Sequence, residues 1–361
     1  MALVNLGESL KLANQRYEVS RKLRAKYVVP EAALLGTALE AQVYLNQQQL
    51  EAQREGEHRQ VIISMKSRAV PTNGTARQTR PVGTITPTES VTLTYKTVTE
   101  TMAITKKMLD DNLLLIDEYY SNEVMQRCSF LRNEMSKDLL MTSQQLRATD
   151  FPFSNGKQLR LPFNKTTLCF ESDATAATAN LFFNQVSILM QQCLIPPTYK
   201  AIANASAMER MWFLSKQGTG NAQNLAWQFD SLFPTENIIS EQMLGLYIDT
   251  PYDNTVPYVL AFGEGSFSVL PWVPKMNKKG WGEKDSYLGA FYTLKDPLYG
   301  DRLEYHVREV SDTIDSNTLV TLGDPQDIVT HIEIGCTYAI PVISAPQAQV
   351  LGVAQPSILG K

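Results

Sequence analysis

The sequence contains few of the residues from which redox and metal sites are built. It has four cysteines and three histidines among 361 residues, and no two of the cysteines form a CxxC pair. The cysteines are Cys128, Cys169, Cys193 and Cys336, and the histidines are His58, His306 and His331. Zinc sites and disulfide frameworks are usually recognised in a sequence by short, regular spacings of these residues, and this sequence has no such spacings. We expect reduced thiols, no bound metal and no cofactor.

Signals for export and for membrane insertion are also missing. The first twenty residues, MALVNLGESLKLANQRYEVS, lack the basic start and the apolar block of a signal peptide. No apolar run approaches the roughly 20 residues needed to cross a bilayer. We therefore expect a chain that is neither exported by that route nor embedded in a membrane, and that keeps its thiols reduced in the cytoplasm.

Motifs that carry catalysis are absent as well. The sequence has no GxSxG elbow, no P-loop and no EF-hand loop. Its one glycine-rich phrase, residues 263–268, lacks the third glycine of a dinucleotide fingerprint and lies between two predicted strands, so it is interpreted as a hairpin turn. Adjacent carboxylates such as Asp110 and Asp111 are expected by chance among 37 acidic residues, and turn or cap roles are favoured for them. No enzyme is predicted.

A long helix is the strongest positive feature. The segment from Ile104 to Leu146 contains neither glycine nor proline. Its apolar residues recur at steps of four, three, four and four, which is the period of one helix face: Val124, Cys128, Leu131, Met135 and Leu139. At about 1.5 Å per residue an unbroken helix here would span on the order of 60 Å, too long for a compact domain to enclose.

A long β-hairpin is predicted just before this helix, from Val61 to Thr101. Both halves are rich in β-branched residues, the second half alternates almost strictly, and the segment between them holds three prolines and two glycines. The strands are rich in threonine and offer little apolar surface, and an isolated hairpin is marginal in water. Such an arm needs a partner surface.

The chain as a whole has no basic excess, but its charge is unevenly distributed. The net charge is −4 and the sequence pI is near 5.6, which argues against sequence-specific nucleic-acid binding. Residues 61–107 carry seven basic and two acidic side chains, a net charge of +5, whereas the chain from residue 108 onward carries −10. The basic hairpin is either a solvated surface or an arm that lies on an acidic copy of the same chain.

The remaining segments predict an α+β body. Helices are expected over residues 5–27, 31–56 and about 174–194, and a further helix follows a buried strand near residue 200, with Ser206 as its N-cap. Beyond residue 225 short strands alternate with glycine and proline. The last sixteen residues, 346–361, are weakly patterned and are interpreted as a docking tail or a frayed end. A composition of 43% hydrophobic and 19% charged residues fits a folded body with sizeable cores.

This order of parts resembles the major capsid proteins of tailed bacteriophages with the Hong Kong 97-type fold. The resemblance is carried by the long hairpin, by the corner and helix at ITKKMLDDNLLLIDEYYSNEVMQRCSFLRNEMSKDLL, and by the helix and strand NLFFNQVSILMQQCLIPPTYKAIANAS. It implies an N-terminal helical arm, an extended β-hairpin loop, a peripheral domain with a spine helix, an axial domain with strands that return through the peripheral domain, and a C-terminal tail. The implied bounds are 1–60, 61–103, 104–172, 173–345 and 346–361.

The resemblance also implies a structural function. Hexamers and pentamers of such a protein close into an icosahedral or prolate head around double-stranded DNA, and portal, decoration and separate scaffolding proteins are its potential partners. We expect the basic residues of the extended loop to contact a neighbouring subunit: Lys66, Arg68, Arg77, Arg80 and Lys96. No covalent crosslink is predicted, because nothing distinguishes Lys66 or Lys96 as its lysine. The alternatives are the shell of an encapsulin-type nanocompartment and, less favoured, an α+β enzyme.

Overall fold

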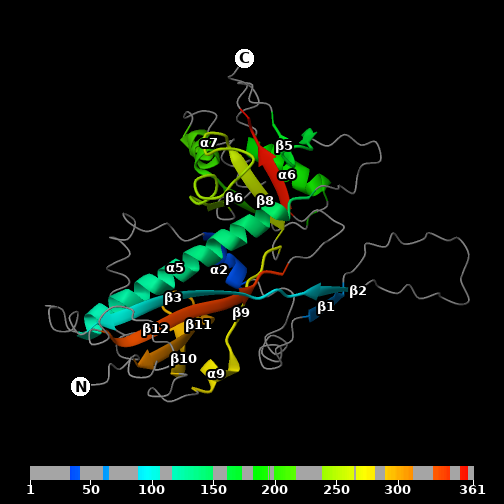
Figure 1. Ribbon diagram of the computed structural model, residues 1–361. Helices are drawn as coiled ribbons and strands as arrows, with labels where there is room; N and C mark the ends of the chain where they lie inside the picture. Colours follow the sequence, from blue (N-terminus) through cyan, green and yellow to red (C-terminus); the bar gives the residue numbers. More distant parts are fainter. Residues whose placement is uncertain are drawn as a thin grey trace, which may run out of the picture.

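Two large β-sheets, a two-stranded sheet and one long helix form the described part of the chain, which is therefore of the predicted α+β class (Figure 1). The computed structural model describes residues 33–40, 60–64, 88–105, 116–148, 161–172, 182–193, 195, 199–216, 238–263, 266–280, 289–311, 328–341 and 350–356. Helix α5 lies across one sheet, and the second sheet lies beyond the C-terminal end of this helix (Figure 1).

The long helix α5 runs from Ile116 to Gln145. Its thirty residues make a rod of about 45 Å. The predicted apolar face is confirmed, because Val124, Cys128, Leu131, Met135 and Leu139 are all buried in the main hydrophobic core. The predicted start at residue 104 is wrong, because Ile104 and Thr105 still pair with a neighbouring strand. Their β-branched side chains continue the alternating pattern of the strand before them. Residues 106–115 lie outside the described part of the chain.

The five-stranded sheet packs against α5 and is antiparallel throughout. The order is β10-β11-β12-β3, and the short strand β9 pairs with the end of β12. The strands are β3 (Lys96–Thr105), β9 (Leu270–Trp272), β10 (Ala290–Asp296), β11 (Gly300–Ser311) and β12 (Ile328–Ala339). Alternation of side chains gives the sheet two unlike faces. Tyr305 and Val307 of β11 are buried in the core with α5, whereas His306 and Arg308 are only half-buried on the other face.

The six-stranded sheet is covered on both faces. Its order is β4-β5-β13-β8-β6-β7. The strands are β4 (Phe163–Asn164), β5 (Cys169–Glu171), β6 (Tyr199–Ala203), β7 (Ile238–Ser240), β8 (Tyr258–Gly263) and β13 (Val350–Ala354). Strand β8 is buried at every residue: Leu260 and Phe262 belong to the core shared with α5, and Val259 and Ala261 belong to a second core. A strand buried on both faces reads as a continuous apolar run, as β8 does.

Helices of the second core cover the outer face of the six-stranded sheet. Helix α6 (Phe182–Gln192) contributes Phe182, Val186, Leu189 and Met190, and α7 (Ala205–Lys216) contributes Ala207. The α7 cap differs from the prediction. Asn204 is the N-cap residue, because its Oδ1 accepts the backbone N–H of Ala207 at 3.0 Å, while the Ser206 hydroxyl donates to the carbonyl of Asn254.

The C-terminal segment is part of the core, contrary to the prediction of a docking or frayed tail. Strand β13 pairs in parallel with β5 and antiparallel with β8, and all five of its residues are buried. Neighbours far away in sequence create this environment, so the segment shows no strong pattern of its own. Residues 357–361 lie outside the described part of the chain.

Two short helices pack on the body, and one predicted hairpin turn is not found. Helix α2 (Ala33–Glu40) buries Leu34, Leu35 and Leu39 in the core with α5, which confirms that part of the predicted helix 31–56. Helix α9 (Lys275–Lys278) precedes β10. The interpretation of residues 263–268 as a hairpin turn is wrong, because β8 before them and β9 after them belong to different sheets. The predicted helix 5–27 lies outside the described residues.

Candidate functional site: the hairpin and the helix-backed sheet

The predicted hairpin is confirmed at its base, but its predicted end at Thr101 is wrong, because residues 96–101 belong to β3 and pair with β12 in the five-stranded sheet. Strands β1 (Gln60–Ser64) and β2 (Thr88–Thr92) pair antiparallel, with Gln60 opposite Thr92 and Ser64 opposite Thr88. They form a two-stranded sheet of their own, and within the described chain neither strand pairs with any other. Figure 1 shows this hairpin beyond the end of the five-stranded sheet, at a distance from α5. The rest of the hairpin, residues 65–87, lies outside the described residues, and with it Lys66, Arg68, Arg77 and Arg80.

A three-residue break joins the hairpin to the five-stranded sheet. Residues 93–95 are not in a strand, although the sequence pattern predicts one continuous strand there. Leu93 is 2% exposed, and the ring of Tyr95 lies 5.9 Å from the ring of Trp272 in β9. Burial of one side chain and aromatic contact of the other attach the base of the hairpin to the body.

Lys96, the first residue of β3, is ion-paired within its own chain. Its Nζ lies 2.6 Å from Oδ2 of Asp138 on α5, and the hydroxyl of Tyr338 on β12 donates to the same carboxylate. Burial and the negative charge of Asp138 raise the pKa of Tyr338. The Lys96 side chain is 54% exposed, and a solvated ion pair of this kind contributes about 1 kcal/mol at most. Its predicted contact with a neighbouring subunit stays a prediction.

A second ion pair ties the same strand to the same helix. Arg127 lies 3.2 Å from Glu100 of β3 and 3.5 Å from Glu123 one turn earlier on α5. Going from Lys96 to Glu100 advances β3 by four residues, about 13 Å, while the partners go back eleven residues on α5, about 16 Å. The strand therefore runs along the helix in the opposite direction, with one polar contact at each end of this stretch.

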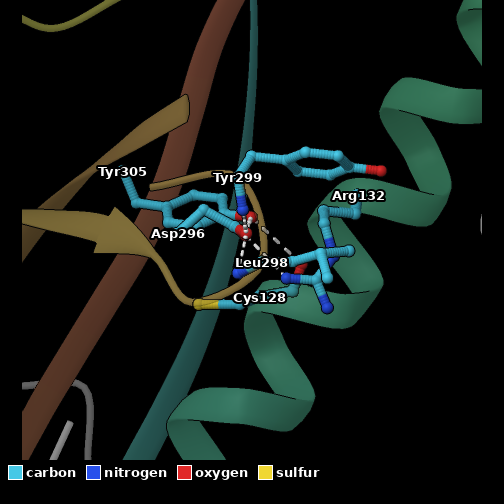
Figure 2. A network of polar contacts seen from close by, with 6 residues as sticks. All are labelled: Cys128, Arg132, Asp296, Leu298, Tyr299 and Tyr305. Atoms are coloured by element: carbon cyan, nitrogen blue, oxygen red, sulfur yellow. Dashed lines mark hydrogen bonds and ion pairs between the residues drawn. The ribbon is translucent and has the colours of Figure 1, made fainter. Parts of the chain in front are cut away.

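A buried ion pair connects α5 to β10, the strand at the opposite edge of the sheet from β3 (Figure 2). Arg132 and Asp296, at the end of β10, have fully buried side chains, and Nη1 lies 2.6 Å from Oδ2. The hydroxyl of Tyr305 donates to the same oxygen at 2.6 Å. Oδ1 accepts the backbone N–H groups of Leu298 and Tyr299 at 2.7 and 2.8 Å. Burial and the neighbouring carboxylate raise the pKa of Tyr305. Sequence reasoning missed this pair, although an arginine directly after the core residue Leu131 was a detectable signal.

The two sheets differ at their edges. Strand β3 is an edge strand of ten residues whose Thr97, Thr99 and Thr101 side chains are exposed. The edges of the six-stranded sheet are strands of two and three residues. A short edge strand offers little backbone for pairing with another chain, and a long one offers much more. The strand edges available for pairing with another chain are therefore on the five-stranded sheet and the hairpin.

In the described part of the chain, metal-ligating and nucleophilic side chains do not form a cluster. No three or more of its His, Cys, Asp and Glu side chains are grouped so that they could hold a metal ion. All four cysteines are buried and none is in a disulfide. Burial raises the pKa of Cys193 to about 11 and that of Cys336 to about 12, so both stay protonated at neutral pH. Among the described helices, none combines the length and the apolar character that crossing a bilayer requires.

Comparisons with known proteins find similarity in structure only. No family model and no curated protein matches the sequence. The capsid of Ralstonia phage GP4 is 12% identical, with 84% of each chain covered and a TM-score of 0.41. The mature capsid of bacteriophage PhiM1 is 9% identical, with 84% of each chain covered and a TM-score of 0.44. A structure from Mycobacterium phage Che8 is 12% identical over 91% of this chain and 92% of that chain, with a TM-score of 0.44.

Two of these solved structures are phage capsids. With identities far below 25% and TM-scores below 0.5, they transfer no residue role to this chain.

Proposed function

We propose that this chain is a structural shell protein, the major capsid protein of a tailed bacteriophage with the Hong Kong 97-type fold. Copies form hexamers and pentamers that close into an icosahedral or prolate head around double-stranded DNA. The protein is synthesised in the host cytoplasm and ends in the virion. The observation that carries the proposal is the β1–β2 hairpin, which pairs with no other described strand. A two-stranded hairpin is marginal in water by itself, so a neighbouring copy supplies the surface on which it lies.

The proposed fold has five sequence segments, and strands from several of them combine in each large sheet. The N-terminal arm is 1–60, the extended loop is 61–103, the peripheral domain is 104–172 and the axial domain is 173–345. The last segment is 346–361, and its strand β13 belongs to the six-stranded sheet. Helix α5 and the five-stranded sheet form the peripheral part, to which β9, β10, β11 and β12 return from late in the sequence. The six-stranded sheet forms the axial part, and it also takes β4 and β5 from before residue 173 and β13 from after residue 345. The axial part is therefore assembled from three of the five sequence segments.

Opposite net charges favour contact between the extended loop of one copy and the body of another. Residues 61–107 carry +5 and the chain from residue 108 carries −10, so an extended loop is attracted to the body of a neighbour. Lys66, Arg68, Arg77, Arg80 and Lys96 are the proposed contact residues. Each exposed pair contributes about 1 kcal/mol or less, and repetition over many copies makes the sum large. The same surfaces must accept both five-fold and six-fold packing, which the terminal arm and the hairpin accommodate. Scaffolding, portal and decoration proteins are the further partners.

Two other functions make different predictions. An encapsulin-type shell would contain a protein cargo instead of DNA, so the contents of purified particles distinguish the two. An α+β enzyme would stay a small oligomer and would have a concave pocket with convergent titratable groups.

The test is assembly of the full recombinant chain, followed by negative-stain electron microscopy and size-exclusion chromatography. Wild-type protein should form closed particles. The variant R68E/R77E/R80E should fold, with an unchanged circular dichroism spectrum, and should form few or no particles. The matched control is K275E/K278E/K279E, which makes the same charge change at three exposed lysines in and after α9. A wild-type chain that stays monomeric at high concentration would refute the shell function, and normal particles from R68E/R77E/R80E would refute the loop contact.

A further inference from the structure

The Arg132–Asp296 pair lies at a place where a charged contact adds little net stability. Both side chains are fully buried between α5 and the β10–β11 turn (Figure 2). Desolvation of two ions opposes their attraction, and apolar replacement of a whole buried pair is often neutral or stabilising. The pair instead fixes the positions of the groups around it. Each carboxylate oxygen accepts two donors, so the positions of Arg132, Tyr305 and the turn are all defined by one group.

In the described part of the chain, the other ion pairs between α5 and this sheet are at its β3 edge, and Tyr338 of the adjacent strand β12 donates to Asp138. The Tyr305 hydroxyl also lies 3.4 Å from the carbonyl of Cys128 on α5. Lys96 and Glu100 belong to β3, at one edge of the order β10-β11-β12-β3, whereas Asp296 belongs to β10 at the opposite edge. The β3 contacts are partly exposed and therefore weak. The apolar contacts between helix and sheet are not directional, so they resist separation more than tilting.

A tilt of the sheet about β3 would change the shape of the subunit. The far strand β10 is three strand spacings from β3, about 14 Å, so a tilt of about 10° would move it by about 2.5 Å. A closed shell repeats one interface geometry many times, and a spread of subunit shapes broadens the range of curvatures that can form.

We propose that Arg132 and Asp296 are positioning residues for assembly, which set the angle of the five-stranded sheet against α5 and thereby keep all copies alike. This inference rests on the proposed shell function. It adds to it a specific source of uniform curvature, inside the subunit and away from any contact between subunits.

The test variant removes the charge pair and keeps the surrounding hydrogen bonds. In R132M/D296N, methionine fills the volume of the arginine, and the asparagine Oδ1 still accepts the N–H groups of Leu298 and Tyr299. The asparagine Nδ2 can donate to the Tyr305 oxygen, whose hydrogen then turns toward the carbonyl of Cys128, 3.4 Å away. The matched control, K295M/D301N, removes an exposed ion pair between β10 and β11, and it likewise removes one positive and one negative charge.

Two readouts separate positioning from a merely structural role. The first is the distribution of particle diameters in electron micrographs. The second is the distance distribution between spin labels at M141C on α5 and T293C on β10 in the unassembled full-length chain, measured by pulsed electron paramagnetic resonance. Both label positions are exposed and all four native cysteines are buried, so labelling is selective.

We expect R132M/D296N to melt within a few degrees of wild type, to broaden the label distance distribution, and to give particles of mixed diameter and open sheets. The control K295M/D301N should match wild type in both readouts. Wild-type diameters and an unchanged distance distribution in R132M/D296N would overturn the inference and leave the shell function intact. Should wild type itself form no particles, the shell function fails and the distance distribution alone decides the positioning role.

A second variant covers the case in which R132M/D296N does not fold. R132K keeps the positive charge beside Asp296 but replaces the rigid planar fork by a flexible point charge, so it should fold and still relax the angle. A broadened distance distribution in R132K supports the inference, and an unchanged one contradicts it.

Discussion

The two large sheets of this protein have their apolar faces covered in different ways. The six-stranded sheet has a core on each face, contributed by α5 on one side and by α6 and α7 on the other, and its edge strands are two and three residues long. The five-stranded sheet buries one face against α5 and presents threonines and charged groups on the other, and its edge strand β3 has ten residues. One sheet is therefore devoted to folding, whereas the other keeps backbone and side chains available to other molecules.

Removal of the C-terminal strand should have the largest effect. Deleting residues 346–361 removes β13, whose Val350, Leu351, Val353 and Ala354 side chains are buried in the middle of the six-stranded sheet. At about 1.5 to 3 kcal/mol for each large side chain, the loss is comparable to the 5 to 15 kcal/mol that stabilises a typical domain. We expect no cooperative thermal transition by circular dichroism. Deletion of 357–361 alone is the control, and a wild-type melting temperature after the longer deletion would contradict the central role of β13.

Truncation of matched residues in the two sheets should have unequal effects. Leu260 is fully buried on β8, so L260A should lower the free energy of unfolding by about 2 to 5 kcal/mol. Thr101 is exposed on the edge strand β3, so T101A should change it by about 1 kcal/mol or less. Urea denaturation followed by tryptophan fluorescence measures both. Equal losses would mean that the outer face of the five-stranded sheet is packed as tightly as the interior of the other sheet.

A smaller effect is expected from pH at the outer face of the five-stranded sheet. The His306 ring lies against Gly335 on β12, where a Cβ atom would come within 2.3 Å of Nε2, and burial lowers the pKa of this histidine. The His306 side chain therefore binds a proton more readily in the unfolded chain than in the folded chain. Stability is therefore complete above the unfolded pKa of about 6.5, and decreases as the pH falls from there toward the folded pKa.

Replacement of the histidine checks this expectation. Urea midpoints at pH 7.5 and pH 5 should differ less in H306Q than in wild type, because glutamine does not titrate. An identical pH dependence in the two proteins would show that other groups cause it.

Local patterns in the sequence were sufficient for the elements that depend on neighbours along the chain. The period of Val124, Cys128, Leu131, Met135 and Leu139 predicted which face of α5 is buried, since helical spacing alone places these side chains together. Alternating β-branched residues predicted the strands for the same kind of reason, but not that Lys96–Thr105 pairs with β12 outside the hairpin. The contact role of Lys66, Arg68, Arg77 and Arg80 is still a prediction, because these residues lie outside the described part of the chain.

Tertiary structure alone decided the features that join distant segments. The weak pattern of residues 350–354 did not indicate a central strand, because β5 and β8 create the environment that buries them. The glycines of residues 263–268 predicted a hairpin turn, but β8 and β9 on either side of them belong to different sheets. Arg132 and Asp296 are 164 residues apart, and no local rule pairs them. The sequence by itself determined the helix period, the strand alternation and the distribution of charge, because these depend on residues a few positions apart. Strand order and the buried ion pair depend on which surfaces meet when the whole chain folds.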